Sequence, residues 1–396
     1  MVTIKEIAKY CDVSIATVSN ILNGKPNASE ETKRRVLKAI EELNYTPNYV
    51  AKNLKTRRTK TIGVIVEDIT IFCAPEIIDG ITKCCEERGY HILLTNLRLY
   101  KKFGDSYYTG DKFFTIINKE IKELISKQVD GIVYVTAHER ILRCFPDKMT
   151  VPASMAYGYT KSDRYPSVVV DDKSGAYDIV NYAISMGHTN IGVIAGKENS
   201  IHTHDRLLGY QKALYDHKLF FNPDIIVEGD WTRASGYDNT DYLLSQNVTA
   251  IFCMNDIMAG GVYDRLEEKG MVPGEDISVM GFDNRELSNF YKPPLTTIEL
   301  PLYAIGYTAC MDVIQQIEIE QGELDKTEAA AAKRGSNKPE SAGEISGKNG
   351  TSGSNVDGEV SGKNGTSGSN SNGQSGVIEV SKKGTLLKRE SVKNIL

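Results

Sequence analysis

The stretch VSIATVSNILNG, residues 13–24, combines the spacing of a short helix with an unusual set of polar side chains. They are short hydroxyls and amides, not the Lys and Glu of an ordinary solvent-facing helix. A helix docked in the major groove of DNA needs short donors and acceptors near its N-terminal end, because its backbone lies close to the base edges. Candidate contacts are Ser14, Ile15, Ala16, Thr17, Ser19 and Asn20. In that setting Ile15 or Ala16 could touch a thymine methyl group, and Asn20 could pair with adenine.

Basic residues surround this stretch. Residues 1–60 contain 12 Lys and Arg against 6 Asp and Glu, a net charge of +6, whereas the remainder contains 35 against 46, a net charge of −11. Arg34, Arg35 and Lys38 could hold phosphates, which position a protein on DNA without reading its sequence. This asymmetry indicates that the head meets a polyanion and the body does not. A small helical module that binds protein is the alternative for the head taken alone.

Three short helices must position these residues. Thr3 and Glu6 form a predicted capping box that opens a helix from Ile4 to about Cys11, and Ser14 caps a second helix that ends near Leu22. Ser29 caps a third helix over about 30–43. Its inward-facing residues should be Val36, Leu37, Ile40 and Leu43. Helices joined by a four-residue turn predict a helix-turn-helix head.

From Thr61 onward, apolar strands alternate with amphipathic helices, as in TIGVIV, YHILLT, DGIVYV, NIGVIAG, TAIFCM and DISVMGF. This βαβ repetition over about 230 residues predicts an α/β core of parallel sheets in two stacked units. Ligands of such sheets bind beyond the carboxyl ends of the strands, and between two units they bind in the cleft.

After a helix near 303–318 the composition changes sharply. Residues 329–376 are almost free of large apolar side chains, and SGKNGTSGSN occurs twice in them. Such a segment cannot offset the entropy cost of ordering, so we expect a disordered insertion. Apolar alternation returns in VIEVSKKGTLLKRESV, which predicts a hairpin turning near Gly384.

Several classes of protein are disfavoured. No apolar run approaches the ~18–20 residues of a membrane span, and a signal peptide is not evident, so we expect a cytoplasmic protein and not a secreted binding protein. The seven cysteines are odd in number and scattered, which is typical of reduced thiols. There is no G-x-S-x-G, no glycine-rich phosphate loop and no clustered metal ligands; His202 and His204 are only a weak signal. We therefore expect neither an enzyme nor a metal site nor a cofactor.

The segments TIKEIAKYCDVSIATVSNILNG and YTPNYVAKNLKTRRTKTIGVIV resemble the lactose-repressor (LacI/GalR) family of bacterial transcription regulators. The resemblance continues through VDGIV, GHTNIGVIAG, RLLGY, NDIMAGG, ISVMGFDN and PPLTTIELP. It implies a helix-turn-helix head, a hinge helix, and a two-subdomain core like that of periplasmic sugar-binding proteins. It also implies a homodimer on a pseudo-palindromic operator, with a small molecule in the cleft altering DNA affinity.

For DNA binding, the resemblance places Ile15, Ala16 and Asn20 where the family reads bases. Asn20 stands where Arg is most common, which implies an atypical operator, and Asp12 stands where Gly is usual in the turn. Asp tolerates the left-handed backbone that this turn needs. In the hinge, Leu54 would be the minor-groove wedge, with a small Ala51 and a phosphate-binding Lys52. The remaining candidate DNA contacts are Thr3 and Asn23.

For the effector, the family places an Arg, an aromatic ring, an Asn and an Asp in the cleft. The matching residues are Arg206, Trp231, Asn255 and Asp283. Such a set suits a sugar, because Arg and Asp can clamp vicinal hydroxyls and an indole can stack on the pyranose C–H face. Arg206 and Asp283 could instead form a structural ion pair, and we expect Asp256 to cap the helix that starts near Met258.

Other cleft positions depart from common family patterns and leave the effector open. Tyr157 stands where several sugar-responsive members carry Asp, and the purine-sensing branch looks different at Ser200 and His202. The candidate residues at the mouth of the cleft are Phe72, Cys73, Tyr157 and His202.

The sequence thus predicts a DNA-binding regulator, most simply a repressor, controlled allosterically by a sugar or sugar phosphate. Closure of the core would shift the paired hinge helices relative to each other. Effector and operator would then act on the same equilibrium between two conformations of the hinges. The alternative is a regulator driven by a protein cofactor, with a vestigial cleft. The predicted parts are a head (1–46), a hinge (47–60), an N-subdomain (61–160 and 291–325), a C-subdomain (161–290 and 377–396) and the insertion (326–376).

Overall fold

The computed structural model describes residues 2–22, 24–45, 58–104, 106, 113–147, 149–335 and 377–396, with the side chains of residues 324–335 excepted. The chain forms two compact units that divide after Lys60. Each unit has its own hydrophobic core.

The first unit is the predicted helix-turn-helix. Its helices are α1 (Ile4–Tyr10), α2 (Ile15–Leu22) and α3 (Glu30–Glu42). The capping box is present, since the Thr3 amide donates to Glu6 Oε2 at 2.7 Å and the Thr3 hydroxyl accepts from the Glu6 amide. Ser29 caps α3 by accepting from the Thr32 amide at 3.2 Å. The turn before α2 has Asp12 in the left-handed region (φ 48°), which confirms that Asp can replace Gly there.

One predicted core position of the head is wrong. Val36 is fully buried, but Leu37 is 43% exposed. Successive helical residues lie about 100° apart, so α3 turns Leu37 to solvent while Val36 and Ala39 face α1 and α2.

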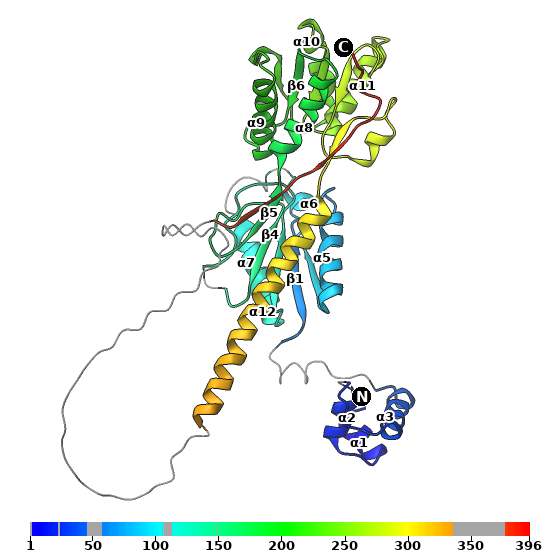
Figure 1. The fold of residues 1–396 in the computed structure, drawn as a ribbon, viewed down its shortest axis with the longest axis vertical. Coiled ribbons are helices and arrows are strands. Elements are labelled where there is room, and N and C mark those ends of the chain that lie inside the picture. The colour runs from blue at the N-terminus through cyan, green and yellow to red at the C-terminus, as the bar shows by residue number, and fades with distance from the viewer. Residues whose placement is uncertain are drawn as a thin grey trace, which may run out of the picture. The chain divides into compact units, whose positions relative to one another are not determined.

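The second unit holds two parallel sheets flanked by helices (Figure 1), which confirms the predicted α/β class. The first sheet has the order β11-β5-β4-β3-β1-β2. Its strands are β1 (Thr61–Val66), β2 (His91–Asn96), β3 (Gly131–Val135), β4 (Ala153–Ala156), β5 (Ser167–Val170) and β11 (Glu379–Lys382). The helices of this half are α5 (Ala74–Arg88), α6 (Leu99–Phe103), α7 (Phe114–Ser126) and α12 (Leu302–Gly335).

The second sheet has the order β7-β6-β8-β9. Its strands are β6 (Ile191–Ala195), β7 (Ile226–Glu228), β8 (Ala250–Cys253) and β9 (Ser278–Met280). Its helices are α8 (Asp172–Ser185), α9 (Ile201–Asp216), α10 (Arg233–Ser245) and α11 (Asp256–Glu268), with short 3-10 turns η3 (Pro223–Ile225) and η4 (Glu286–Asn289). A two-stranded antiparallel sheet pairs β10 (Thr297–Glu299) with β12 (Thr385–Leu387).

The predicted hairpin near Gly384 is wrong, although both of its strands exist. β11 pairs in parallel with β5, and β12 pairs with β10. Each strand therefore takes a partner distant in sequence, and the segment carries the chain from the first sheet to the second (red in Figure 1). Gly384 lies where an added Cβ would stand 2.6 Å from the Glu299 carbonyl oxygen, so the close approach needs glycine.

This pairing also moves the predicted subdomain boundaries. β5 and β11 belong to the first sheet, whereas the sequence analysis assigned residues 161–290 and 377–396 to the C-subdomain. The crossing to the second subdomain follows β5, where α8 begins at Asp172.

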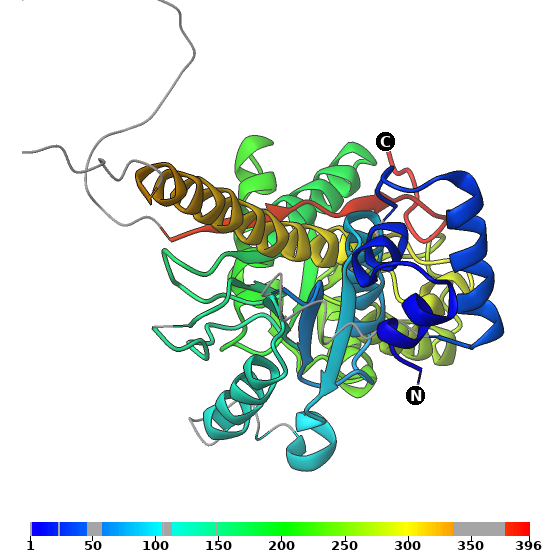
Figure 2. The same ribbon diagram turned by 90° about the horizontal axis from the view of Figure 1, so that it is seen from below.

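α12 is longer than predicted and continues beyond the rest of the first sheet (Figure 2). Residues 326–335 of the predicted insertion are helical, because Ala329–Ala332 is a run of the best helix formers. Residues 336–376 lie outside the described residues. Despite this length, no helix in the described segments is apolar enough over a sufficient span to cross a membrane.

Candidate functional site

The exposed side of α2 carries the residues predicted to read bases. Ser14, Ile15 and Ala16 are exposed, whereas Val18 and Ile21 are buried against α1 and α3. Ile15, an apolar residue, is 44% exposed. The first turn of α2 thus presents small uncharged side chains to solvent.

Hydroxyls at this turn also hold the helix. Ser14 Oγ accepts from the Thr17 amide at 3.0 Å and lies 2.9 Å from Thr17 Oγ1, which confirms Ser14 as a cap. Thr17, Ser19 and Asn20 are partly buried. The predicted contacts Asn23, Ala51, Lys52 and Leu54 lie outside the described residues, and Thr3 serves the cap of α1.

Arg206, on α9, is the centre of a buried network in the core. Its side chain is 2% exposed. Nε donates to Asp172 Oδ1 at 2.7 Å, Nη1 donates to the Met254 carbonyl oxygen, and Nη2 lies 3.6 Å from Asp283 Oδ1. The guanidinium carbon lies 3.8 Å from the centre of the Phe282 ring, within cation–π range.

His202, one turn before Arg206, belongs to the same network. Its Nδ1 lies 2.6 Å from Asp172 Oδ2, so one carboxylate orients both the imidazole and the guanidinium. The imidazole ring lies 5.6 Å from the Tyr157 ring, centre to centre. The structure therefore brings Arg206, His202, Tyr157 and Asp283 together.

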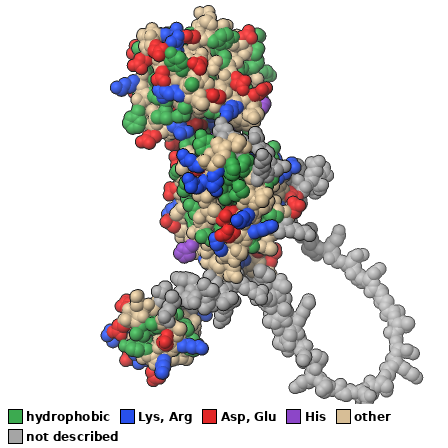
Figure 3. Space-filling model, turned by 180° about the vertical axis from the view of Figure 1, so that it is seen from behind, with side chains coloured by type: hydrophobic (Ala, Val, Ile, Leu, Met, Phe, Trp, Pro, Cys, Tyr) green, Lys and Arg blue, Asp and Glu red, His purple; other side chains and the backbone are tan. Residues whose placement is uncertain are grey.

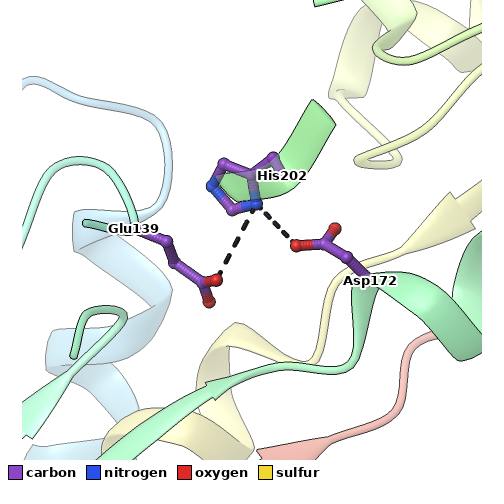
Figure 4. A group of neighbouring side chains, drawn as sticks. All are labelled: Glu139, Asp172 and His202. Carbon is purple, nitrogen blue, oxygen red and sulfur yellow. Dashed lines mark hydrogen bonds and ion pairs between the residues drawn. The ribbon is translucent and has the colours of Figure 1, made fainter. Parts of the chain in front are cut away.

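Two acidic members of this network were not predicted. Asp172 is the second residue after β5 in the run SVVVDDK, and Glu139 is the fourth residue after β3. Figure 4 shows Glu139, Asp172 and His202 converging, with Glu139 Oε2 3.9 Å from His202 Nδ1. The available signal was an acidic residue just beyond the carboxyl end of a parallel strand.

This group is the one set of three potential metal ligands among the described residues. It does not resemble a metal centre, however. Both oxygens of Asp172 are already engaged, by Arg206 and His202. A guanidinium at 2.7 Å from a ligand oxygen also opposes a second cation.

The buried charges shift one another's pKa values. Burial would raise the pKa of Asp172, but Arg206 and His202 outweigh it and lower that pKa. Burial opposes the charged form of His202, yet Asp172 raises its pKa. Burial raises the pKa of Asp283 to about 6 and that of Glu139 to about 7, despite their basic neighbours. The network therefore holds two carboxyls that are costly to ionise.

Trp231 and Asn255 lie on the second subdomain. The Trp231 ring is 5.8 Å from the Arg206 guanidinium carbon and packs on Gly196, where no side chain would fit. Asn255 Nδ2 donates to the Trp231 carbonyl oxygen at 3.1 Å, and Asn255 Oδ1 accepts from the Met258 amide at 2.7 Å. The helix cap is thus Asn255, and the prediction that Asp256 caps α11 is wrong because Asp256 is itself the first residue of the helix.

Three residues of this site have a left-handed backbone. Tyr157, Trp231 and Asp283 have φ values of 64°, 73° and 106°, in a region that non-glycine residues rarely adopt. Such conformations cost about 1–3 kcal/mol each and cluster at binding sites.

The other two predicted cleft residues differ in access. Phe72 lies under Arg285, whose guanidinium carbon is 4.1 Å from the ring centre. Cys73 is fully buried, with its thiol 3.6 Å from the Ala137 carbonyl oxygen. A cavity of about 580 Å³ adjoins the network and is lined by Phe72, Glu76, Asp283, Asn284, Arg285, Glu286, Leu287, Phe290 and Leu302. Phe72 and Asp283 thus face open space, whereas Arg206 and His202 lie behind it.

Comparisons with known proteins agree with this architecture. Residues 3–48 match "Bacterial regulatory proteins, lacI family", and residues 180–336 match "Periplasmic binding protein-like domain". The chain is 34% identical over 325 residues to the HTH-type transcriptional repressor PurR of Aliivibrio fischeri, which covers 80% of this chain and 92% of that protein. It is 35% identical over 316 residues to catabolite control protein A of Priestia megaterium, which covers 78% of this chain and 90% of that protein.

Among solved structures, the lac repressor dimer bound to operator and the anti-inducer ONPF has a TM-score of 0.66 at 24% identity, covering 99% of both chains. This likeness supports the fold. The chain therefore belongs to the lacI family of bacterial regulatory proteins. It is a DNA-binding transcription regulator and not an enzyme.

Proposed function

We propose that this regulator is a repressor whose exposed α2 surface reads operator DNA and whose buried Arg206 network receives a small polar effector. The observation that carries the effector assignment is the convergence of Arg206, Asp172 and Asp283 beside residues with strained backbones. Burying charged groups is costly, so a vestigial cleft that no longer binds a ligand would be expected to lose these buried charges. The network thus favours a small molecule over a protein cofactor.

The DNA contacts in this proposal are Ser14, Ile15, Ala16, Thr17 and Asn20, with phosphates held by Arg34, Arg35 and Lys38. The hinge residues Ala51, Lys52 and Leu54 would enter the minor groove. By analogy with the operator-bound dimer of the lac repressor, two copies of this chain would bind a pseudo-palindrome in the cytoplasm. In this arrangement the neutral side chains of α2 would read the base sequence, and the basic side chains of α3 would position the head on the phosphates.

DNA binding can be tested with operators selected from a pool of random duplexes. Fluorescence anisotropy of a selected duplex should show affinity that falls steeply with salt, by several phosphate contacts' worth per dimer. An affinity independent of salt would remove the assignment of the head.

The effector site can be tested through Trp231, the single tryptophan of the chain. Its fluorescence would be followed during titration with mono- and disaccharides, sugar phosphates and purines. A saturable change that is lost in Arg206→Lys, which keeps the charge but not the guanidinium fork, supports an effector in the cleft. A flat response to the whole panel would favour control by a protein cofactor instead.

A further inference from the structure

Glu139 has a carboxylate oxygen that its surroundings leave unused. The side chain is fully buried, and Oε1 accepts from the Val170 amide at 2.7 Å. Oε2 is buried without a hydrogen-bond partner. A buried acceptor left without a partner costs about 1–3 kcal/mol, more if it is charged, so an unpaired carboxylate oxygen calls for an explanation.

The nearest basic atom does not satisfy this oxygen. His202 Nδ1 is 3.9 Å from Glu139 Oε2 but only 2.6 Å from Asp172 Oδ2, so its proton is committed to Asp172 (Figure 4). Arg206 is committed as well, because each of its three nitrogens has a protein oxygen near it, from Asp172, Met254 and Asp283. A new donor must therefore come from outside the network.

The charge balance restricts what that donor can be. Three carboxyl groups, those of Glu139, Asp172 and Asp283, share two basic partners, Arg206 and His202. Arg285, which also acts on Asp283, lies over Phe72 at the adjoining cavity. A phosphate placed at Glu139 itself would add negative charge where both basic neighbours, Arg206 and His202, are already held by Asp172. A hydroxyl or ammonium group would instead donate to Glu139 Oε2.

The position of Glu139 suits contact with a ligand. It follows β3 of the first sheet, whereas His202 and Arg206 lie on α9 beside the second sheet. Glu139 therefore faces the predicted effector residues from the other subdomain. A ligand that touched Glu139 and Arg206 together would hold both subdomains at once.

From this juxtaposition we infer that Glu139 is an additional effector-binding residue, and that it selects a neutral or amino sugar against a phosphorylated one. The inference rests on the proposed function, since it assumes that an effector occupies the cleft. Burial raises the pKa of Glu139, and a hydrogen bond donated by a ligand would stabilise the ionised carboxylate.

The test uses Trp231 fluorescence and matched ligand pairs: D-glucose with glucose 6-phosphate, D-ribose with ribose 5-phosphate, and glucosamine beside glucose. Wild-type protein should bind at least one neutral or amino sugar saturably, and the phosphate ester of that sugar at least about tenfold more weakly. At pH 8, above the pKa of about 7 of Glu139, Glu139→Gln should weaken binding of the unphosphorylated sugar by about tenfold or more, as expected for a hydrogen bond to a charged acceptor. It should also reduce the discrimination against phosphate.

Glu267→Gln, an exposed residue of α11, is the matched control and should change neither affinity. Equal binding of a sugar and its phosphate, or unchanged affinity in Glu139→Gln, overturns the inference and leaves the proposed function standing. A wild-type protein that binds no member of the panel overturns the proposed effector class, and the inference with it.

Discussion

The α2 surface of the head and the Arg206 network of the core use polar residues in opposite ways. The candidate DNA contacts on α2 are short, uncharged, and exposed or only partly buried, and they cost little to leave in water. In the core a guanidinium, an imidazole and three carboxyls are buried together, and each charge depends on its neighbours. A surface that reads a polyanion can exchange contacts freely, whereas a buried site must keep its charges balanced.

The same contrast appears on the outside of the core, where basic and acidic side chains are interspersed on the face that Figure 3 shows. That mixture on the visible face, with a net charge of −11 beyond residue 60, disfavours competition between the core and the head for DNA. Four substitutions would break or sharpen the comparison between α2 and the Arg206 network.

The largest effect should follow loss of Asp172. Asp172→Ala leaves Arg206 and His202 without their shared acceptor, and we expect about 3–5 kcal/mol of destabilisation, as for other broken buried ion pairs. Urea unfolding followed by Trp231 fluorescence would measure it. Asp216→Ala, at an exposed position of α9, the helix that carries His202 and Arg206, is the control and should leave the unfolding midpoint nearly unchanged.

A second effect should depend on pH. Because the pKa of Glu139 is raised in the folded protein, from an ordinary value near 4.5 to about 7, the folded state retains a proton that the unfolded state loses. Stability should therefore fall as pH rises between these values, and His202, whose pKa is also raised, acts in the same direction. Glu139→Gln should remove the Glu139 part of this loss, on the order of 2 kcal/mol. If the unfolding midpoint changed by the same amount between pH 5 and pH 8 in the variant and in the wild type, Glu139 would not be the source of the pH dependence.

In the head, Asn20→Ala should weaken binding to the selected operator by about 1–3 kcal/mol while leaving nonspecific DNA binding almost intact. The measurement is anisotropy with operator and scrambled duplexes. Equal losses on both duplexes would show that Asn20 does not read a base.

The smallest effect should come from Lys38→Ala. Lys38 is exposed on α3 and lies 3.5 Å from Glu42, so its loss should hardly affect folding. If it holds a phosphate, affinity for every duplex should fall alike, and the slope of log affinity against log salt should drop by about one per contact. An unchanged slope would exclude a phosphate contact.

Local signals were sufficient for much of the fold. The capping residues Thr3, Ser14 and Ser29 predicted where the three helices begin, because a cap depends only on neighbours three residues away. The alternation of strands and helices predicted two parallel sheets for a similar reason. Pairing between distant strands could not be predicted this way, and the expected hairpin at Gly384 failed because β11 and β12 join different sheets.

The candidate site shows the same limit. Family resemblance led to Arg206, His202 and Asp283, which the structure brings together. It did not lead to Asp172 or Glu139, since their roles arise only when loops from two sheets meet. Which of these residues touch an effector stays a prediction.

The pairing of β11 and β12 with different sheets has a consequence for how the chain folds. Residues 377–396 supply an edge strand to the first sheet, and Ser391 accepts from the Val279 amide of the second through its carbonyl oxygen at 2.8 Å. Every other strand precedes this segment along the chain. During synthesis both halves of the core should therefore wait, with open edges, for the same late segment, and a chain truncated before it would expose unpaired strand edges in both halves at once.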